Sequence, residues 1–110
     1  MTILVPPRAH ANIACAVEGF SLSNTISGSL ATSCTITVTP EVEYAAIPAL
    51  IGVPQHVPDA AGSAATTMTW KVTSQSTSAI ALTVTLDQAP GAGKTDTIVF
   101  NGGLIGIPAR

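Results

Sequence analysis

Charged side chains are the scarcest feature of this 110-residue chain. Only 9% of its residues are Asp, Glu, Lys or Arg, with four basic and six acidic residues and a net charge of −2. Soluble domains usually carry about 25% of such residues. Four scattered cations cannot neutralise a run of phosphates, so the composition argues against a nucleic-acid binder. The high net charge and low hydrophobicity of a disordered chain are missing too.

Aromatic residues and long apolar runs are also scarce. One Trp, one Tyr and two Phe are too few for the stacking platforms that bind carbohydrate. No run of 18 apolar residues is present, which argues against a membrane-spanning helix. The first residues lack the basic start and the apolar core of a secretory signal, so we expect a soluble protein made inside the cell.

Cysteine and histidine are too few and too widely spaced for a metal site. Cys15 and Cys34 form no CxxC pair, and neither His10 nor His56 stands at ligand spacing from them. Both cysteines lie in apolar stretches and are expected to be small buried residues, with a disulfide open to them if their strands are neighbours. We expect no metal and no cofactor.

The main positive feature of the sequence is the alternation of apolar and polar residues. The run from Cys34 to Thr39 places apolar residues on one face of a strand and threonines on the other. Threonine is β-branched and polar, which makes it a common outward residue of strands. A flat threonine array could also bind ice, but the fixed coil period of such proteins is missing. The expected strands are 13–17, 20–26, 34–39, 67–73, 80–86, 95–100 and 104–107.

Turn-forming residues separate these strands and define the expected architecture. Asn101-Gly102 is expected to form a tight turn, because both residue types tolerate positive φ. Short strands at this spacing predict an all-β fold, a small antiparallel β-sandwich or jelly roll. Residues 1–110 are expected to form one β domain, with an extended N-terminal arm at 1–10 and a long Pro-rich loop at 40–60.

One glycine-rich segment shares residues with phosphate-binding loops. It runs from Ala89 to Thr95 as APGAGKT and ends in the Gly-Lys-Thr of such a loop. Gln88 stands where the first glycine belongs, and a strand-like stretch follows where a helix would have to begin. We therefore expect a hairpin loop with Lys94 in solvent.

The acidic residues favour structural roles. Glu41 and Glu43 share one face of an extended segment, which is typical of a charged strand edge. Asp59, Asp87 and Asp96 sit beside expected turns, where aspartate bonds the local backbone.

The remaining polar and aromatic residues form no recognisable active site. His56 is expected in a surface loop, and a Ser-His-Asp set drawn with Asp59 lacks a GxSxG nucleophile elbow. Trp70 falls on the inward face of its strand, and Tyr44 is the one aromatic expected at the surface. We expect no catalytic residues and no enzymatic activity.

The segment 80–100, IALTVTLDQAPGAGKTDTIVF, resembles a strand–loop–strand unit of small jelly-roll domains in phage virions and prophage regions. In those domains an apolar strand ends in APGAGK, and a polar-then-apolar strand and an Asn-Gly turn follow. Asn101-Gly102 occupies the place of that turn. Such domains look like the trimeric tumour-necrosis-factor-like or complement-head-like jelly roll. The resemblance covers about a fifth of the chain and implies a β-sandwich that assembles, with no active site.

The resemblance and the low charge together predict a structural virion protein. We expect a homotrimeric capsid decoration (cement) protein that binds between capsomers and stabilises a phage head. Its partners are expected to be the major capsid protein or other virion subunits, without nucleic acid or membrane, in a virion assembled in the host cytoplasm.

The alternative is a fibre-tip or spike module that recognises a host-surface glycan through Tyr44, Glu41 and Glu43. For the decoration protein, the arm and the 40–60 segment should supply the contacts. The residues expected at this interface are Ile3, Leu4, Val5, Pro6, Pro7, Arg8, Tyr44, Ile47, Leu50, Ile51 and Val53.

Overall fold

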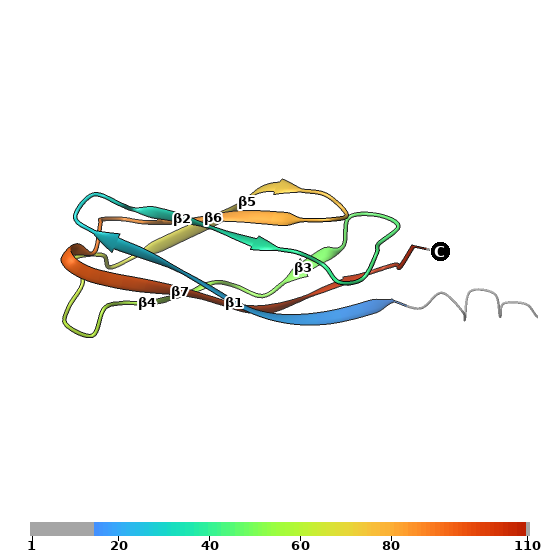
Figure 1. Cartoon of the computed structure of the whole chain (residues 1–110), viewed down its shortest axis with the longest axis horizontal. Helices are drawn as coiled ribbons and strands as arrows, with labels where there is room; N and C mark the ends of the chain where they lie inside the picture. The colour runs from blue at the N-terminus through green and yellow to red at the C-terminus, as the bar shows by residue number, and fades with distance from the viewer. Residues whose placement is uncertain (1–14, 110) are drawn as a thin grey trace, which may run out of the picture.

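The computed structural model of the chain describes residues 15–109, and this part consists of strands and loops without a helix. The strands form two antiparallel sheets in a β-sandwich-like arrangement (Figure 1), which confirms the predicted all-β class. The strands are β1 (Ala16–Gly28), β2 (Ser33–Val38), β3 (Ala49–Ile51), β4 (Gln55–Val57), β5 (Met68–Gln75), β6 (Ile80–Leu86) and β7 (Gly91–Gly106).

Each sheet is built around one central strand. In sheet A, β7 pairs with β1 on one side and with the short strands β3 and β4 on the other. In sheet B, β6 lies between β2 and β5. The β1 and β2 edges are bridged by Asn24, whose Nδ2 donates to the carbonyl of Thr35 at 2.7 Å. The sandwich is therefore tied together on the β1–β2 side.

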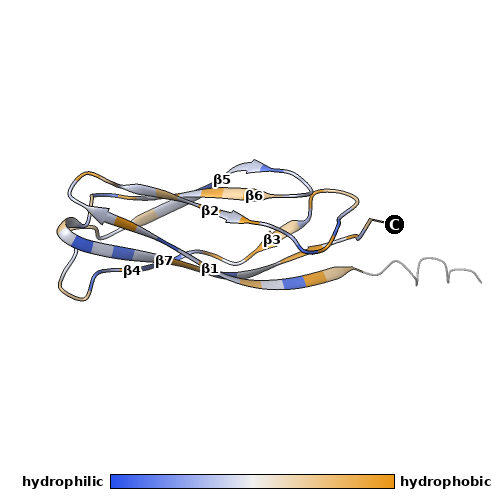
Figure 2. Cartoon of the chain, in the orientation of Figure 1, coloured by the Kyte–Doolittle hydropathy of each residue, from blue (hydrophilic) through white to orange (hydrophobic). Residues whose placement is uncertain are grey.

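The core lies between the two sheets and follows the predicted alternation. On β2, Ile36 and Val38 are buried while the intervening threonines are exposed, and β6 shows the same pattern. The ring of Phe100 on β7 meets that of Phe20 edge-on, with centroids 5.0 Å apart. Each fully buried side chain of this size stabilises the fold by about 1.5–3 kcal/mol. Figure 2 shows blue, hydrophilic bands on the part of β7 that lies near β4.

The N-terminal part of the described chain differs from the prediction. One continuous strand, β1, replaces the two expected strands. Because Phe20 and Leu22 face the core, the side-chain period of two forces Cys15 and Val17 to the outside. Val17 is 70% exposed and Cys15 is exposed, so the expected burial of Cys15 is wrong. Cys34 is half-buried, and both cysteines are free thiols.

The predicted Asn101-Gly102 turn is wrong, because β7 runs straight through both residues. Neither residue has a positive φ. Gly102 serves a different purpose: a Cβ there would collide with the carbonyl oxygen of Ile51 and crowd the Phe20 and Phe100 rings. The missing side chain lets β3 approach β7 closely enough to pair with it.

The 40–60 segment is not one long loop, since it contains β3 and β4. Both strands pair with β7 and are only three residues long. Prolines limit them: Pro48 precedes β3, Pro54 precedes β4 and Pro58 follows it. Proline cannot donate a ladder hydrogen bond, so each one ends the pairing at its position.

The glycine-rich segment 89–95 is not a hairpin loop, because β6 and β7 belong to different sheets. It carries the chain from sheet B to sheet A, and β7 already begins at Gly91. Gly91 and Gly93 adopt φ values of 123° and 71°, which favour glycine. A strand follows the glycines, so the helix of a phosphate-binding loop is missing here, and Lys94 is half-buried.

The close approach of β3 to β7 gives a direct test. Gly102→Ala is expected to lower the free energy of unfolding by about 1–3 kcal/mol, because the new methyl group meets backbone that cannot move aside. Gly19→Ala is the matched control, since a Cβ there finds only the carbonyl oxygen of Gly102 at 3.8 Å. Urea unfolding measures both. Equal stability of the two variants would contradict the packing argument.

Candidate functional site

The most extensive candidate surface is the outer face of sheet A. None of its members, all in the described part of the chain, is charged. Two glycines, Gly19 and Gly103, pair with each other on this face, so no side chain projects from it there. The members are Val17, Gly19, Ser21, Ser23, Thr25 and Ser27 from β1, Thr95, Thr97, Val99, Asn101, Gly103 and Ile105 from β7, Ala49 and Ile51 from β3, and Gln55 and Val57 from β4.

This face divides into a polar half and an apolar half. The strand register places Val17, Ile105 and Ala49 in one row across three strands, with Ile51 in the next row. We call these four residues the apolar end of sheet A. Ile107 continues it beyond β7 and is exposed. An uncharged apolar surface of this kind is typical of a contact with another protein.

The residues expected at the interface lie in different environments in the structure. Ile47, Ile51 and Val53 are exposed. Leu50 faces inward from β3 and is half-buried, and Tyr44 is only 5% exposed. The arm residues lie outside the described part of the chain: Ile3, Leu4, Val5, Pro6, Pro7 and Arg8.

Tyr44 is a structural anchor, so its expected place at the surface is wrong. Its hydroxyl donates to Glu18 Oε1 at 2.8 Å, and the backbone N–H groups of Glu41 and Val42 donate to the same carboxylate at 3.0 and 3.4 Å. Burial and the bond to Glu18 raise the pKa of Tyr44 to about 12. The N–H of Glu41 holds the pKa of Glu18 below its usual value. Residues 41–44 are thereby fastened to β1.

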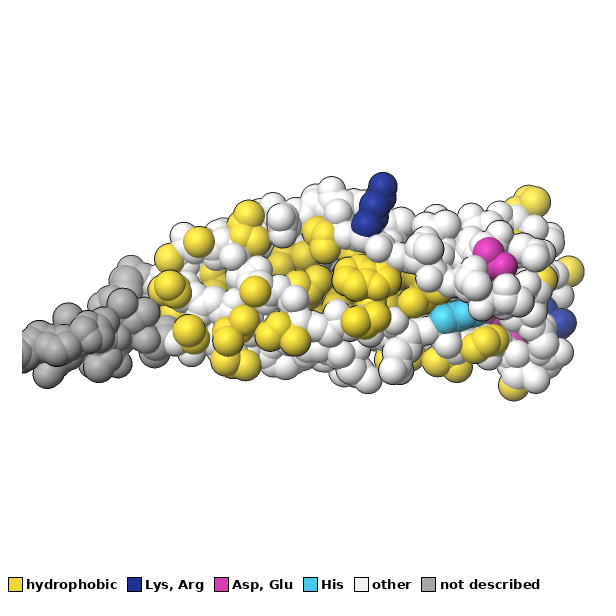
Figure 3. All heavy atoms as spheres, turned by 180° about the vertical axis from the view of Figure 1, so that it is seen from behind, with side chains coloured by type: hydrophobic (Ala, Val, Ile, Leu, Met, Phe, Trp, Pro, Cys, Tyr) yellow, Lys and Arg dark blue, Asp and Glu magenta, His cyan; other side chains and the backbone are white. Residues whose placement is uncertain are grey.

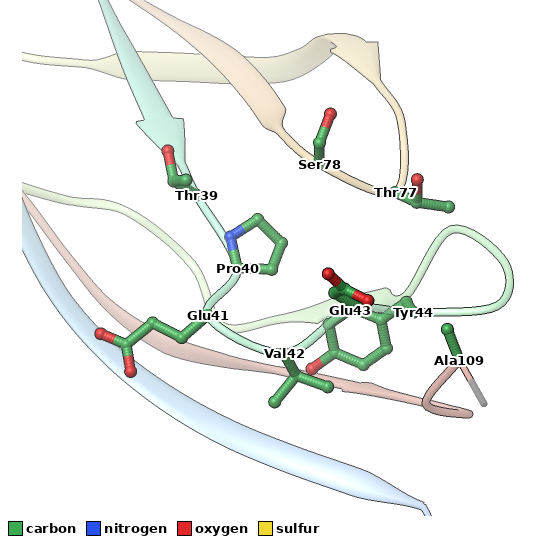
Figure 4. A pocket seen from close by; sticks show the side chains of 9 residues that line it. All are labelled: Thr39, Pro40, Glu41, Val42, Glu43, Tyr44, Thr77, Ser78 and Ala109. Atoms are coloured by element: carbon green, nitrogen blue, oxygen red, sulfur yellow. The ribbon is translucent and has the colours of Figure 1, made fainter.

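A pocket opens on the other side of this anchored segment (Figure 4). Its volume is about 540 Å³. Glu41 points away from the other labelled side chains, whereas Glu43 lies nearer to Tyr44. The lining combines carboxylates, hydroxyls and small apolar groups. Its residues are Thr39, Pro40, Glu41, Val42, Glu43, Tyr44, Thr77, Ser78 and Ala109.

Asp96 is the most unusual polar residue of the described chain, because it is fully buried on the inward face of β7. Nε2 of His56 and Oγ of Ser63 both lie 2.7 Å from its Oδ2. The backbone N–H of Asp59 donates to its Oδ1 at 2.9 Å. Burial raises the pKa of this carboxyl, but the bonds from His56, Ser63 and Asp59 outweigh it and hold the pKa below its usual value.

His56, Ser63 and Asp96 come together without forming a catalytic triad. In a triad the serine hydroxyl bonds to the histidine ring, which removes its proton. Here Ser63 donates to Asp96, and His56 Nε2 is occupied by the same carboxylate oxygen. Asp59, drawn into the candidate triad, instead accepts from the N–H groups of Ala61 and Thr95 at 2.8 and 2.7 Å. The set holds the fold and leaves Ser63 without a base.

Two sequence expectations are corrected by this cluster. His56 lies on β4 and bonds a buried carboxylate, so its assignment to a surface loop is wrong. Asp96 is buried in β7 and not beside a turn. One signal was present in the sequence: Asp96 shares the inward register of Ile98 and Phe100, and a charge at such a position needs donors around it.

Asp87 fixes a later part of the segment that connects β4 to β5. It accepts the N–H groups of Thr66 and Thr67 at 2.8 and 3.0 Å and the Thr66 hydroxyl at 2.7 Å. These bonds, that of Thr67 first, lower its pKa to about 2. Asp59, Asp87 and Asp96 together fix the segment that leads from β4 in sheet A to β5 in sheet B.

The outer face of sheet B carries the predicted threonine rows. Thr69 and Thr85 are neighbours across β5 and β6, and Thr83 lies opposite both Thr35 and Lys71. Within the described residues, Lys71 is the single charged side chain on this face. The outward placement of threonine is therefore confirmed.

No family model, curated protein or solved structure matches this chain. Within residues 15–109, no group of three His, Cys, Asp or Glu side chains is arranged to hold a metal ion. The same residues contain no helix long and apolar enough to cross a membrane.

The buried carboxylate gives the second test. Asp96→Asn is expected to lower the free energy of unfolding at neutral pH by about 2–3 kcal/mol, because an amide group then faces donors that the carboxylate accepted. Glu43→Gln, at an exposed carboxylate, is the control. An unchanged stability of Asp96→Asn would contradict this role.

The acid dependence follows from the same bonds. The pKa values of Asp87 and Asp96 are lowered in the folded state, to about 2 for Asp87. Their contribution is therefore complete above the unfolded value of about 3.9 and is lost as the pH falls through the folded values. The urea midpoint should drop between about pH 4 and pH 2, and less steeply in Asp96→Asn.

Proposed function

We propose that this protein is a structural virion component, a capsid decoration protein that binds between the capsomers of a phage head. The uncharged outer face of sheet A carries the proposal. A permanent contact needs an apolar centre without unpaired charges, and the apolar end provides one. The carboxylates of Glu18 and Asp96 accept hydrogen bonds that hold the fold, which is compatible with a structural role.

The order of the strands supports the jelly-roll part of the proposal. Two of the strand pairs are nested, β1 with β7 and β2 with β6 inside it, while β3 and β4 also pair with β7. The connection β1–β2 and the connection β6–β7 both cross from one sheet to the other. A jelly roll wraps in this way, with strands from the two ends of the chain paired in each sheet.

The size of the chain favours assembly. A small domain buries a modest core, so contacts with neighbouring subunits add stability. Apolar area removed from water contributes about 25 cal/mol per Å². Each copy need bind only weakly, because many copies on one shell act together. A homotrimer at a local symmetry point is the assembly that we propose.

The pocket beside Glu43 favours a second candidate, a fibre-tip or spike module that binds a host-surface glycan. Its carboxylate and hydroxyl groups match the donors and acceptors of a sugar. Saturable binding on a glycan array, lost in Glu43→Gln and retained in Val17→Lys, is the expected result for this candidate. The same array should show no binding if the protein is a decoration protein only.

The decoration role is tested by placing a charge on the apolar end. Val17→Lys is expected to weaken binding to phage heads by about tenfold or more, because the charge must be desolvated at the contact. The probe is heads of the virus that encodes the chain, purified without it, and bound protein is measured by co-sedimentation. Val17 is 70% exposed, so the fold should survive.

Leu30→Lys is the matched control. Leu30 is 91% exposed in the β1–β2 connection, away from the outer face of sheet A. This variant should bind heads like the unchanged chain. Absence of binding by the unchanged chain would overturn the proposed function, and equal binding by Val17→Lys would remove the apolar end from it.

A further inference from the structure

The outer edge of β5 is a second surface that needs explanation. β5 pairs with β6 along one side, and no strand within residues 15–109 pairs with its other side. The strand is eight residues long, so a row of backbone N–H and C=O groups faces outward. Edges of this kind are templates for pairing with another strand.

The inward side chains of β5 are also incompletely covered. Trp70 pairs with Val84, and Val72 with Leu82. The two β6 residues are fully buried, yet Trp70 is half-buried and Val72 is 39% exposed. A strand beyond β5 would cover them.

The edge of sheet A that lies across from β5 explains why Trp70 and Val72 are incompletely covered. It consists of β3 and β4, three residues each, with an irregular segment between them that exposes Val53. The sandwich therefore stays open along the side between β5 and these two strands. Figure 3 views the molecule from this side and shows apolar side chains gathered in a hollow along it.

We propose that the β5 edge accepts a strand from a second copy of this chain, formed by residues 1–5. Ile3 and Val5 would lie over Trp70 and Val72, and backbone bonds would extend sheet B by one strand. This inference deepens the proposed assembly role and rests on it for the identity of the occupant. To the proposed assembly it adds a specific acceptor surface, the β5 edge, for the N-terminal segment.

The sequence of residues 1–14 fits this occupant. Ile3 and Val5 are two apart, so an extended backbone directs both to one face. Residues 1–5 carry no charged side chain, which suits a position beside Lys71 on the acceptor strand. Pro6 and Pro7 then end the pairing, because they lack an N–H group. Pairing with β5 would therefore end at Pro6.

The geometry favours a second copy over the same chain. The described part begins at Cys15, at the end of the sandwich where the β5–β6 turn and Ala109 also lie. The shortest path from Cys15 would lay the chain's own residues 1–5 along β5 in the parallel direction. A second copy can pair antiparallel, as every strand pair of sheet B does.

Trp70 makes the proposal directly measurable, because it is the only tryptophan. In the full chain, the Trp emission maximum should shift to shorter wavelength as the protein concentration rises, together with an increase in mass by light scattering. Ile3→Ser/Val5→Ser should remove both changes. Leu4→Ser, whose side chain would point away from the core, is the matched control and should retain them.

A synthetic peptide of residues 1–8 provides the reciprocal measurement. Added to the Ile3→Ser/Val5→Ser chain, it should restore the shift saturably. Val72→Asp should weaken its binding by about tenfold or more, and Thr69→Asp, on the outward face of β5, should not. Emission that neither concentration nor peptide alters would overturn the proposal. A shifted emission in a monomer at every concentration would also overturn it, since the segment would then dock on its own chain.

Binding to phage heads separates this inference from the proposed function. If heads bind the unchanged chain while the peptide has no effect on Trp70, the β5 acceptor is wrong and the decoration role stands. If the peptide binds but heads do not, strand exchange stands and the decoration role is wrong.

Discussion

The carboxylate of Asp96 is the constraint on which the path of the chain depends. β7 is the central strand of sheet A, and its inward register is set by Ile98 and Phe100, so Asp96 must point into the core. An ionised group without partners there would cost several kcal/mol. The chain between β4 and β5 supplies the partners: a histidine nitrogen, a serine hydroxyl and a backbone N–H. One buried charge thereby determines where the chain crosses from sheet A to sheet B.

Much of the strand content could be predicted from the sequence. Alternation of apolar and polar residues with a period of two indicates which side chains of a strand face inward. Cys34, Ile36 and Val38 alternate with threonines, and the structure places them as this pattern requires. The pattern fails where the residue type is required by contact with a neighbouring strand and not by the residue's own strand. Gly102 signalled a turn, but it is a glycine because β3 passes against it. Such a contact is set by the tertiary fold and leaves no local signal.

The candidate surface was harder to predict for a related reason. Cys15 was expected to be buried, and the continuity of β1 with Phe20 and Leu22 turned it and Val17 outward. A shift of one residue exchanges the two faces of a strand. The apolar residues around Val17 fit a core-facing strand in one register, and the continuity of β1 into Phe20 and Leu22 imposes the other. The exposed apolar end of sheet A is a consequence of that continuity.

The distribution of the few charges links the fold to assembly. Four of the six acidic residues, Glu18, Asp59, Asp87 and Asp96, accept hydrogen bonds that hold connections in place. The two sheet faces are left with Lys71 alone among the described residues. A protein that kept its charges on these faces would repel its neighbours at close packing. Here the charges stabilise loops, and the faces stay free for contact.

The two contact surfaces proposed for this small subunit have a geometric consequence. In the strand exchange that we propose, residues 1–5 of one copy and the β5 edge of the next would form a heterologous contact, because donor and acceptor are different parts of the chain. Heterologous contacts close into rings when the rotation between copies permits it, and otherwise grow as open filaments. A ring of three uses every donor and every acceptor and leaves no exposed β5 edge. The apolar end of sheet A, which lies on the opposite sheet from β5, then remains available for the shell on which the ring would sit.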